Sequence, residues 1–170
     1  MTAEYVDNAR LDRLVREYGD MVYRLAIIRC HSKEDAEDVF QDVFVKLVRN
    51  IGKLNTDEHV KAWLIRVTIN QCNSLYASSW NKKTQSYEEM VENGAVPDAA
   101  APEEEPLDEV YEAVRSLQPE YRDVIYLFYY EELSIKQIGQ ILNLSEGNVK
   151  VRLNRARKKL KVMLEKEGVQ

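Results

Sequence analysis

Apolar residues recur at three- and four-residue steps in both halves of the chain, which is the period of an amphipathic α-helix. Nothing in the sequence is typical of a group of strands, so the pattern predicts an all-α protein. Two helices in the first half each have one apolar stripe: Leu11, Leu14, Val15, Tyr18, Val22, Leu25 and Ala26 in one, and Ala36, Val39, Phe40, Val43, Phe44 and Leu47 in the other.

Polar residues mark the beginnings of these helices. Ser32 can cap the second helix, and Glu34 and Asp35 stand in its first turn, where acidic residues interact favourably with the helix dipole. A third helix is predicted to begin near Asp57 and to run towards Trp80. The first half should therefore contain three helices.

The C-terminal part has the signals of a short helix, a turn and a longer helix. Pro119 suits the first turn of a preceding helix with the sequence EYRDVIYLFYY. Ser134 and Gln137 fit a capping box, and residues 143 to 146 supply the turn, with Ser145 as the next cap. The last helix is predicted to bury five residues: Val149, Leu153, Ala156, Leu160 and Leu164.

Charge divides the chain more sharply than hydropathy does. The net charge is -5, yet residues 134–170 hold nine Lys and Arg against three Glu. Residues 84–114 contain ten acids and no base, and residues 84–106 contain three of the four prolines, which is a linker composition. The sequence therefore predicts two helical domains, 1–83 and 107–170, joined by an acidic flexible linker at 84–106.

Several classes of protein are disfavoured by what the sequence lacks. It has no apolar run of about 18 residues and no signal peptide, so we expect a cytoplasmic protein with no membrane insertion. Cys30 and Cys72 are far apart, with only His31 and His59 as possible helpers, so we expect two reduced cysteines rather than a zinc site or a disulfide. No nucleophile, phosphate loop or metal cluster indicates an enzyme, and we expect no cofactor.

The basic C-terminal helix is a candidate for binding duplex DNA. An α-helix fits the major groove, where Arg and Lys can donate to guanine, Asn can pair with adenine, and an apolar group can contact thymine. Basic residues on an exposed helix face often have no role beyond solvation, but their density here and their contrast with the acidic chain favour DNA binding. The first turns contain these base-reading candidates: Asn148, Lys150, Val151, Asn154 and Arg155.

A second candidate surface lies in the first half of the chain. No acidic residue occurs between Glu58 and Glu88, where bases, amides and aromatic residues suit unstacked single-stranded bases. Trp63 itself fits the apolar period, so we expect it in the core, whereas Trp80 lies beyond that period and is expected to be exposed. The helix at 33–50 has an acidic outer face, for which simple solvation is the default interpretation.

Together these segments resemble the extracytoplasmic-function (ECF) sigma factors of bacterial RNA polymerase. The string DAEDVFQDVFVKL at 35–47 is similar to sigma region 2.2, and KAWLIRVTINQCNSLY at 61–76 is similar to regions 2.3 and 2.4. Residues 117–160 are similar to region 4. The resemblance implies a region 2 bundle at 1–83 and a region 4 helix-turn-helix at 107–170.

The resemblance also implies three sets of contact residues. Region 2.2 would bind the β′ clamp helices of core polymerase through Asp35, Asp38, Gln41 and Asp42. Region 2 would melt the minus-ten element and capture a flipped base through Leu54, Asn55, Lys61, Arg66, Asn70, Asn73, Ser74, Lys82 and Lys83. Region 4 would read the minus-thirty-five duplex through Glu146, Asn148, Lys150, Val151, Arg152, Asn154, Arg155 and Lys158.

The partners implied by the resemblance are core polymerase, promoter DNA and an anti-sigma factor, which is often membrane-anchored in this family. Within core polymerase, region 2 would contact the β′ clamp helices and region 4 the β flap. One departure is that many relatives end region 2.4 with an Arg-rich run, whereas this chain keeps only Lys82 and Lys83. The alternative function is a stand-alone dimeric helix-turn-helix regulator, which would need neither the acidic docking helix nor the linker.

Overall fold

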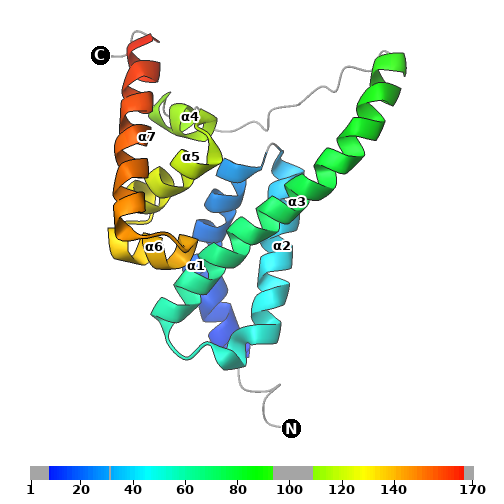
Figure 1. Ribbon diagram of the computed structural model, residues 1–170. Coiled ribbons are helices and arrows are strands. Elements are labelled where there is room, and N and C mark those ends of the chain that lie inside the picture. Colours follow the sequence, from blue (N-terminus) through cyan, green and yellow to red (C-terminus); the bar gives the residue numbers. More distant parts are fainter. Residues whose placement is uncertain (1–7, 31, 94–108, 167–170) are drawn as a thin grey trace. The chain divides into compact units, whose positions relative to one another are not determined.

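The structure is a computed structural model, and it describes residues 8–30, 32–93 and 109–166, except for the side chains of 78–93. These ranges contain no strand, so the predicted all-α class is confirmed. The chain divides into two compact units, Met1–Glu103 and Glu104–Gln170. The elements are shown in Figure 1: α1 (Asn8–Arg29), α2 (Lys33–Asn50), the 3-10 turn η1 (Ile51–Lys53), α3 (Asp57–Asn93), α4 (Glu109–Ser116), α5 (Pro119–Ile125), the π-helical turn η2 (Tyr126–Tyr130), α6 (Ile135–Leu142) and α7 (Glu146–Lys166).

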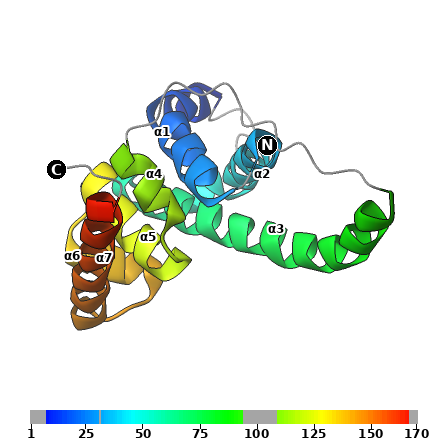
Figure 2. The same ribbon diagram turned by 90° about the horizontal axis from the view of Figure 1, so that it is seen from above.

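The first unit is a bundle in which α1, α2 and α3 all contact one another, with α1 and α2 beside each other along α3 (Figure 2). The predicted stripes form its core, because removing apolar side chains from water is the main driving force for packing. Leu11, Tyr18 and Phe40 are half-buried at the edges of these stripes. The following side chains are at most 1% exposed: Leu14, Val22, Leu25, Ala36, Val39, Val43, Leu47, Val60, Leu64 and Ile65.

The start of α2 is capped as the sequence predicts. The Ser32 Oγ accepts a hydrogen bond of 3.1 Å from the backbone N–H of Asp35. This bond satisfies one of the N–H groups that the first turn of a helix leaves without a partner in the helix. Glu34 and Asp35 lie in that first turn. The cap therefore fixes where the outer face of α2 begins.

Helix α3 continues to Asn93, beyond the expected end near Trp80. No proline precedes Pro97, and Gly94 is the first glycine after Gly52, so residues 84–93 contain no helix breaker. The helical backbone thus enters the range 84–106 that composition assigns to the linker. The boundary between the two compact units, at 103 and 104, also lies within that range.

The second unit is built around α7, which contacts α4, α5 and α6. Pro119 stands at the start of α5, as predicted. The helix predicted from EYRDVIYLFYY ends in the π-helical turn η2, where the Tyr126 hydroxyl donates to Glu131 Oε1 at 3.0 Å. The core side chains of this unit are 0 to 1% exposed: Val114, Val124, Ile125, Tyr126, Leu127, Ile138, Val149, Leu153 and Ala156.

The turn between α6 and α7 has the predicted polar chemistry. Ser134 and Gln137 form both bonds of the capping box at the start of α6. Asn143 ends that helix in the left-handed conformation, with φ 57°, which asparagine tolerates better than most residues. Ser145 Oγ then accepts a 3.1 Å hydrogen bond from the N–H of Asn148 in the first turn of α7.

Gly139 makes this turn possible, which the sequence pattern did not single out. The Leu144 N–H donates to the Gly139 carbonyl at 2.8 Å, so the chain folds back closely onto α6. A Cβ at position 139 would lie 2.7 Å from the Leu144 carbonyl oxygen. Only glycine fits this approach without moving the backbone, and the approach sets the direction in which α7 leaves the turn.

Candidate nucleic-acid interfaces

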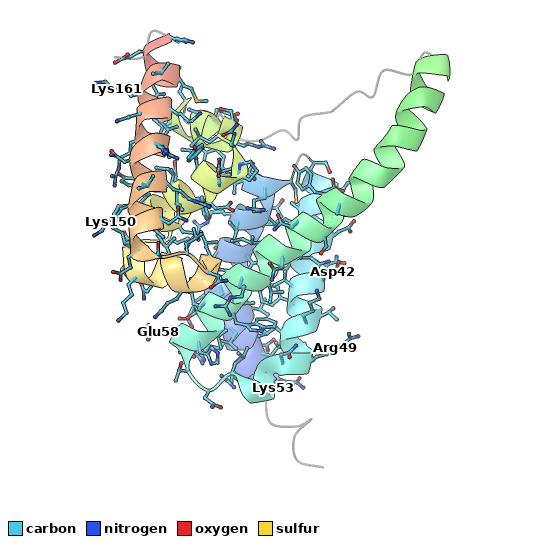
Figure 3. All side chains as sticks on the ribbon, in the orientation of Figure 1. Asp42, Arg49, Lys53, Glu58, Lys150 and Lys161 are labelled. Carbon is cyan, nitrogen blue, oxygen red and sulfur yellow. The ribbon has the colours of Figure 1, made fainter. Side chains whose placement is uncertain are left out.

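The outer face of α7 displays most of the predicted duplex-reading residues. Val149, Leu153 and Ala156 are buried on the inner face, so the helical period turns the intervening positions outward. Val151 is 46% exposed, and Figure 3 shows Lys150 and Lys161 on the outer side of the helix. The exposed members of the predicted set are Glu146, Asn148, Lys150, Val151, Asn154, Arg155 and Lys158.

Three bases of α7 make contacts inside the unit. The Arg157 Nε donates to the Tyr129 hydroxyl at 2.7 Å, and its guanidinium also lies 5.6 Å from the Phe128 and Tyr129 ring centres. Lys159 stands 5.2 Å from the centre of the Tyr121 ring. Arg152, from the predicted set, is half-buried and donates from Nε to Asn148 Oδ1 at 3.3 Å. These partners are uncharged, so the three bases keep their positive charge, but the contacts fix where that charge lies.

The predicted single-strand surface lies along α3. Arg66, Asn70, Asn73 and Ser74 are exposed, and their spacing of four, three and one places them on one helical face. Lys61 is half-buried. This face combines one guanidinium, two amides and one hydroxyl, all of which can donate to DNA bases or phosphates.

The two tryptophans and the two lysines at the end of the predicted single-strand surface have different outcomes. Trp63, expected in the core, is half-buried in α3. The side chains of Trp80, Lys82 and Lys83 lie outside the described residues, so their predicted exposure or contacts stay predictions.

The loop before α3 corrects one predicted contact. Leu54 is only 3% exposed, so its side chain belongs to the core of the bundle and is not available to a captured base. Asn55 beside it is exposed. The sequence could not show that Leu54 is buried and Asn55 exposed, because a short loop has no hydrophobic periodicity from which burial can be predicted.

Helix α1 holds this loop through arginines that sequence reasoning missed. Arg10 donates to the Ile51 carbonyl at 3.3 Å and to the Leu54 carbonyl at 2.5 Å. Arg13 binds both carboxylate oxygens of Asp57, each at 3.0 Å, which is the strong two-bond geometry of a guanidinium and a carboxylate. The Arg13 hydrogen bond holds the pKa of Asp57 below its ordinary value. No sequence signal connects these residues, which are 41 to 44 positions apart.

The outer face of α2 carries the residues predicted to dock on polymerase. Asp38, Gln41 and Asp42 are exposed, and Asp35 is half-buried. Figure 3 shows Asp42 on the outer side of the helix, and its Oδ2 accepts a 3.1 Å hydrogen bond from Gln71 Nε2 of α3. An acceptor on this face therefore touches the helix that carries the single-strand surface.

Two apolar residues on α2 extend this face. Val45 and Val48 are 50% and 53% exposed. Neither valine belongs to the predicted apolar stripe of this helix. Their positions in the sequence could therefore have indicated that they face solvent. Exposed apolar side chains rimmed by polar residues can form part of a protein-binding surface.

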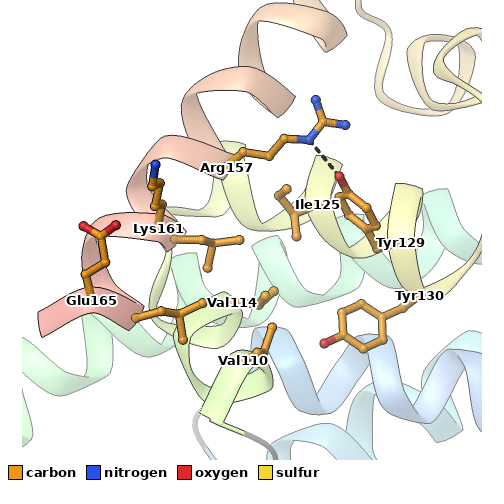
Figure 4. Close-up of a pocket in the computed structure, with 10 residues that line it drawn as sticks. Val110, Val114, Ile125, Tyr129, Tyr130, Arg157, Lys161 and Glu165 are labelled. Carbon is orange, nitrogen blue, oxygen red and sulfur yellow. Dashed lines mark hydrogen bonds between the residues drawn. The ribbon is translucent and has the colours of Figure 1, made fainter. Parts of the chain in front are cut away.

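The second unit also has an apolar groove of about 920 Å³ (Figure 4). Leu160 and Leu164, predicted to be buried, are only half-buried because they line it. Tyr129 is 52% and Tyr130 42% exposed at its side. The groove is lined by Val110, Val114, Ile125, Tyr129, Tyr130, Arg157, Leu160, Lys161, Leu164 and Glu165.

The two cysteines are neighbours, which their separation in the sequence concealed. Cys30 and Cys72 are buried free thiols with their Sγ atoms 3.9 Å apart. Their mutual hydrogen bond, together with burial, raises the pKa of the Cys30 thiol. A raised pKa disfavours the thiolate, which is the reactive form. In the part of the chain that the structure describes, no three His, Cys, Asp or Glu residues gather as a metal site.

Within the described ranges, no helix has the length and apolar character needed to cross a membrane.

Both halves of the chain match family models. Residues 14–82 match Sigma-70 region 2, and residues 107–160 match Sigma-70, region 4. The chain is similar to the ECF RNA polymerase sigma factor SigM of Bacillus subtilis, with 30% identity over 157 residues, which cover 90% of this chain and 94% of that protein. It is also 29% identical to SigW of the same organism over 162 residues, covering 89% and 87% of the two chains.

Two solved structures share the fold. One is the sigma factor RpoE in complex with the anti-sigma factor NepR from Bartonella quintana, with a TM-score of 0.69, 20% identity and coverage of 91% and 96%. The other is CnrH in complex with the cytosolic domain of CnrY, with a TM-score of 0.68, 23% identity and coverage of 96% and 92%.

Proposed function

The chain belongs to the ECF family of RNA polymerase sigma factors, and we propose that its two units divide promoter recognition between them. The observation that carries this proposal is the pair of exposed donor-rich faces, one on α7 in the second unit and one on α3 in the first. Nucleotide addition is left to core polymerase, which this chain directs to promoters. We place this activity in the cytoplasm, where bacterial core polymerase works.

The face of α7 is the proposed reader of the minus-thirty-five duplex. Residues 148 to 158 cover about 15 Å of helix, which is short enough to lie within one passage of the major groove. Asn148, Asn154 and Arg155 can donate to base edges, and the exposed Val151 can meet a thymine methyl group. Lys150 and Lys158 would bind phosphates, which supplies affinity without sequence information.

The face of α3 and the loop before it are the proposed site of minus-ten melting. Unstacking a base costs a few kcal/mol, which a surface of amides and basic groups can offset. Asn70, Asn73, Ser74 and Arg66 supply such groups along one line. Asn55 is an exposed residue of this loop, and the loop backbone is held in place from α1.

The outer face of α2 is the proposed docking surface for the β′ clamp helices. Its acidic residues Asp38 and Asp42 lie about two turns and one turn before the exposed Val45, on the same side of the helix. Opposite charge would steer the encounter with a basic partner, while apolar area would contribute to the binding free energy.

The groove of the second unit is the proposed contact with the β flap. From α7 it uses residues between Arg157 and Glu165, whereas the proposed base-reading residues lie between Asn148 and Arg155. One helix can therefore hold DNA and polymerase at the same time. Arg157 stays folded onto Tyr129 at the rim of the groove and would limit its width (Figure 4).

An anti-sigma factor is the proposed regulator. One of the similar structures is a sigma factor in complex with an anti-sigma factor. The other is CnrH in complex with the cytosolic domain of CnrY. We propose that this chain is held inactive by an anti-sigma factor that is anchored in the membrane and covers the polymerase-binding surfaces of the chain.

The test is run-off transcription from a random promoter library with purified core polymerase, with and without this protein. The expected result is initiation at a defined sequence class only when both are present. A matched sample without core polymerase measures binding of the chain alone to duplex DNA. Tight binding there, with no initiation in the full reaction, would favour a stand-alone regulator instead.

A further inference from the structure

A buried arginine contacts one residue of the α3 face. Arg29, at the C-terminal end of α1, is 4% exposed, and its Nη2 donates to the Asn73 Oδ1 at 2.5 Å. Asn73 itself is exposed. The contact joins residues 44 positions apart, so it exists only because α1 packs against α3.

This contact decides which way the Asn73 amide points. The oxygen and nitrogen of an asparagine amide have nearly the same shape, so their assignment depends on hydrogen-bond partners. A guanidinium has only donors, so the group that faces Arg29 must be the acceptor Oδ1. The reversed amide would place an NH₂ group against a buried positive charge. The NH₂ group is therefore the one that Asn73 presents on its exposed side.

We infer that Asn73 donates a hydrogen bond to an acceptor on promoter DNA and that Arg29 is the positioning residue that fixes it as a donor. This inference rests on the proposed function of the α3 face. The acceptor is a base carbonyl, a ring nitrogen or a phosphate oxygen. The amine of cytosine or adenine is excluded as the partner, because two donors cannot share a hydrogen bond.

Asn73→Asp tests the Arg29 contact without removing it. The new carboxylate keeps an acceptor for Arg29 and strengthens the bond by adding charge. The unfolding equilibrium of the free protein should shift towards the folded state by about fivefold. The matched control is Ala77→Asp, one turn further along the same face, which adds the same exposed charge and should change the equilibrium by about twofold or less.

Asn73→Leu removes the acceptor while keeping a helix-forming residue. It leaves the buried guanidinium without this partner, so the unfolding equilibrium should shift about tenfold towards the unfolded state. Ala77→Leu is its control. Equal stabilities of each variant and its control would overturn the positioning role of Arg29.

The DNA part is tested with holoenzymes assembled from core polymerase and wild type, Asn73→Asp or Ala77→Asp. Each selects from a library of single-stranded oligonucleotides with random sequence. Every base has some acceptor, so the diagnostic result is a reversal at one position. The wild type should enrich a base that presents a carbonyl or an acceptor ring nitrogen to Asn73, and Asn73→Asp should instead enrich a base that presents an N–H group on the same edge, with about a tenfold change in relative affinity. A merely structural role for Asn73 would not reverse a base preference.

A second arm separates base from phosphate. If Asn73→Asp weakens all sequences equally and more than Ala77→Asp does, the acceptor is a phosphate oxygen. In that case one methylphosphonate substitution should abolish the difference between wild type and variant. Identical selection and affinity for wild type and Asn73→Asp would overturn the inference alone. If the wild-type holoenzyme selects no sequence while Asn73→Asp still stabilises the fold, the proposed function fails, and the donor role in DNA binding fails with it.

Discussion

The two surfaces proposed to contact DNA are held in place in different ways. The exposed residues of α7 stand on a helix whose inner face packs on α4, α5 and α6, so the helical backbone fixes their spacing. On α3, side chains from other helices hold the reading elements: Arg29 orients Asn73, and Arg10 and Arg13 hold the loop. A duplex groove has a fixed shape that a straight helix matches, whereas a melted strand has none, so the protein must supply the geometry.

The largest expected effect comes from Gly139→Ala, which disturbs the turn before α7 and makes no change in the unit that contains α3. The added Cβ would lie 2.7 Å from a backbone oxygen, so the turn must open, at a cost of about 2 kcal/mol of folding free energy. Urea unfolding followed by circular dichroism should show an earlier transition in the second unit. The urea midpoint measured by tryptophan fluorescence should match that of the wild type, because Trp63 and Trp80 both lie in the first unit.

Gly147→Ala is the control for that change. No heavy atom lies within 4 Å of the position that its Cβ would take, so it should not destabilise the unit. If both glycine variants unfold like the wild type, the close approach of Leu144 is not what holds α7.

Arg155→Ala tests whether single side chains on α7 carry duplex recognition. It should lower the affinity of the holoenzyme for a selected duplex about tenfold, with no change in the affinity for core polymerase. Fluorescence anisotropy with labelled duplex and with labelled core polymerase measures the two separately. Lys166→Ala, at the exposed end of the same helix, is the matched control. A loss of polymerase binding would show that this face of α7 contacts core polymerase rather than DNA.

Asp38→Arg separates docking from both DNA surfaces. Reversing a charge on the outer face of α2 should weaken binding to core polymerase about tenfold, mainly through slower association. Competition with labelled wild-type protein measures this affinity. Glu37→Arg makes the same change at the edge of that face and should have a smaller effect. Unchanged competition by the Asp38 variant would remove α2 from the docking surface.

The smallest effect is expected for Asp57→Asn, which loosens the loop before α3. Because Arg13 lowers the pKa of Asp57, their ion pair stabilises the fold fully above the ordinary carboxylate pKa. That contribution is lost as the pH falls through the lowered pKa of the folded state. The stability difference between wild type and variant should therefore shrink in acid. Both side chains are 49% exposed, so the difference should be small even at neutral pH.

Urea midpoints across this acidic range measure the effect, with Asp12→Asn as a control carboxylate on α1. A difference that stays constant in acid would mean that the ion pair does not hold the loop. Faster hydrogen exchange at residues 52 to 56 in the Asp57 variant would show that the ion pair holds this loop. The proposed base-reading residues of α7 need no such contact with another helix.

Much of the fold and of the α7 face could be predicted because the relevant signals are local. Capping residues such as Ser32 and Ser134 act within four positions, and so does the period that turns Val149 inward and Lys150 outward. The α2 face followed from the same period, whereas Asn70, Asn73 and Ser74 of α3 were singled out by the resemblance to sigma region 2. Prediction failed where a residue had no periodic neighbours, as for Leu54, or where a helix face met a groove, as for Leu160.

Local patterns in the chain were sufficient to predict most of the helices, their caps, the charge of each segment and the family. Three features became visible only in the packed structure: Leu54 is buried, Cys30 and Cys72 are 3.9 Å apart, and Arg29 orients the amide of Asn73. Hydrogen bonds within a helix join residues four positions apart, so they leave a pattern in the chain. Contacts between residues more than forty positions apart depend on how two helices cross, and that crossing is set by the packing of the whole core.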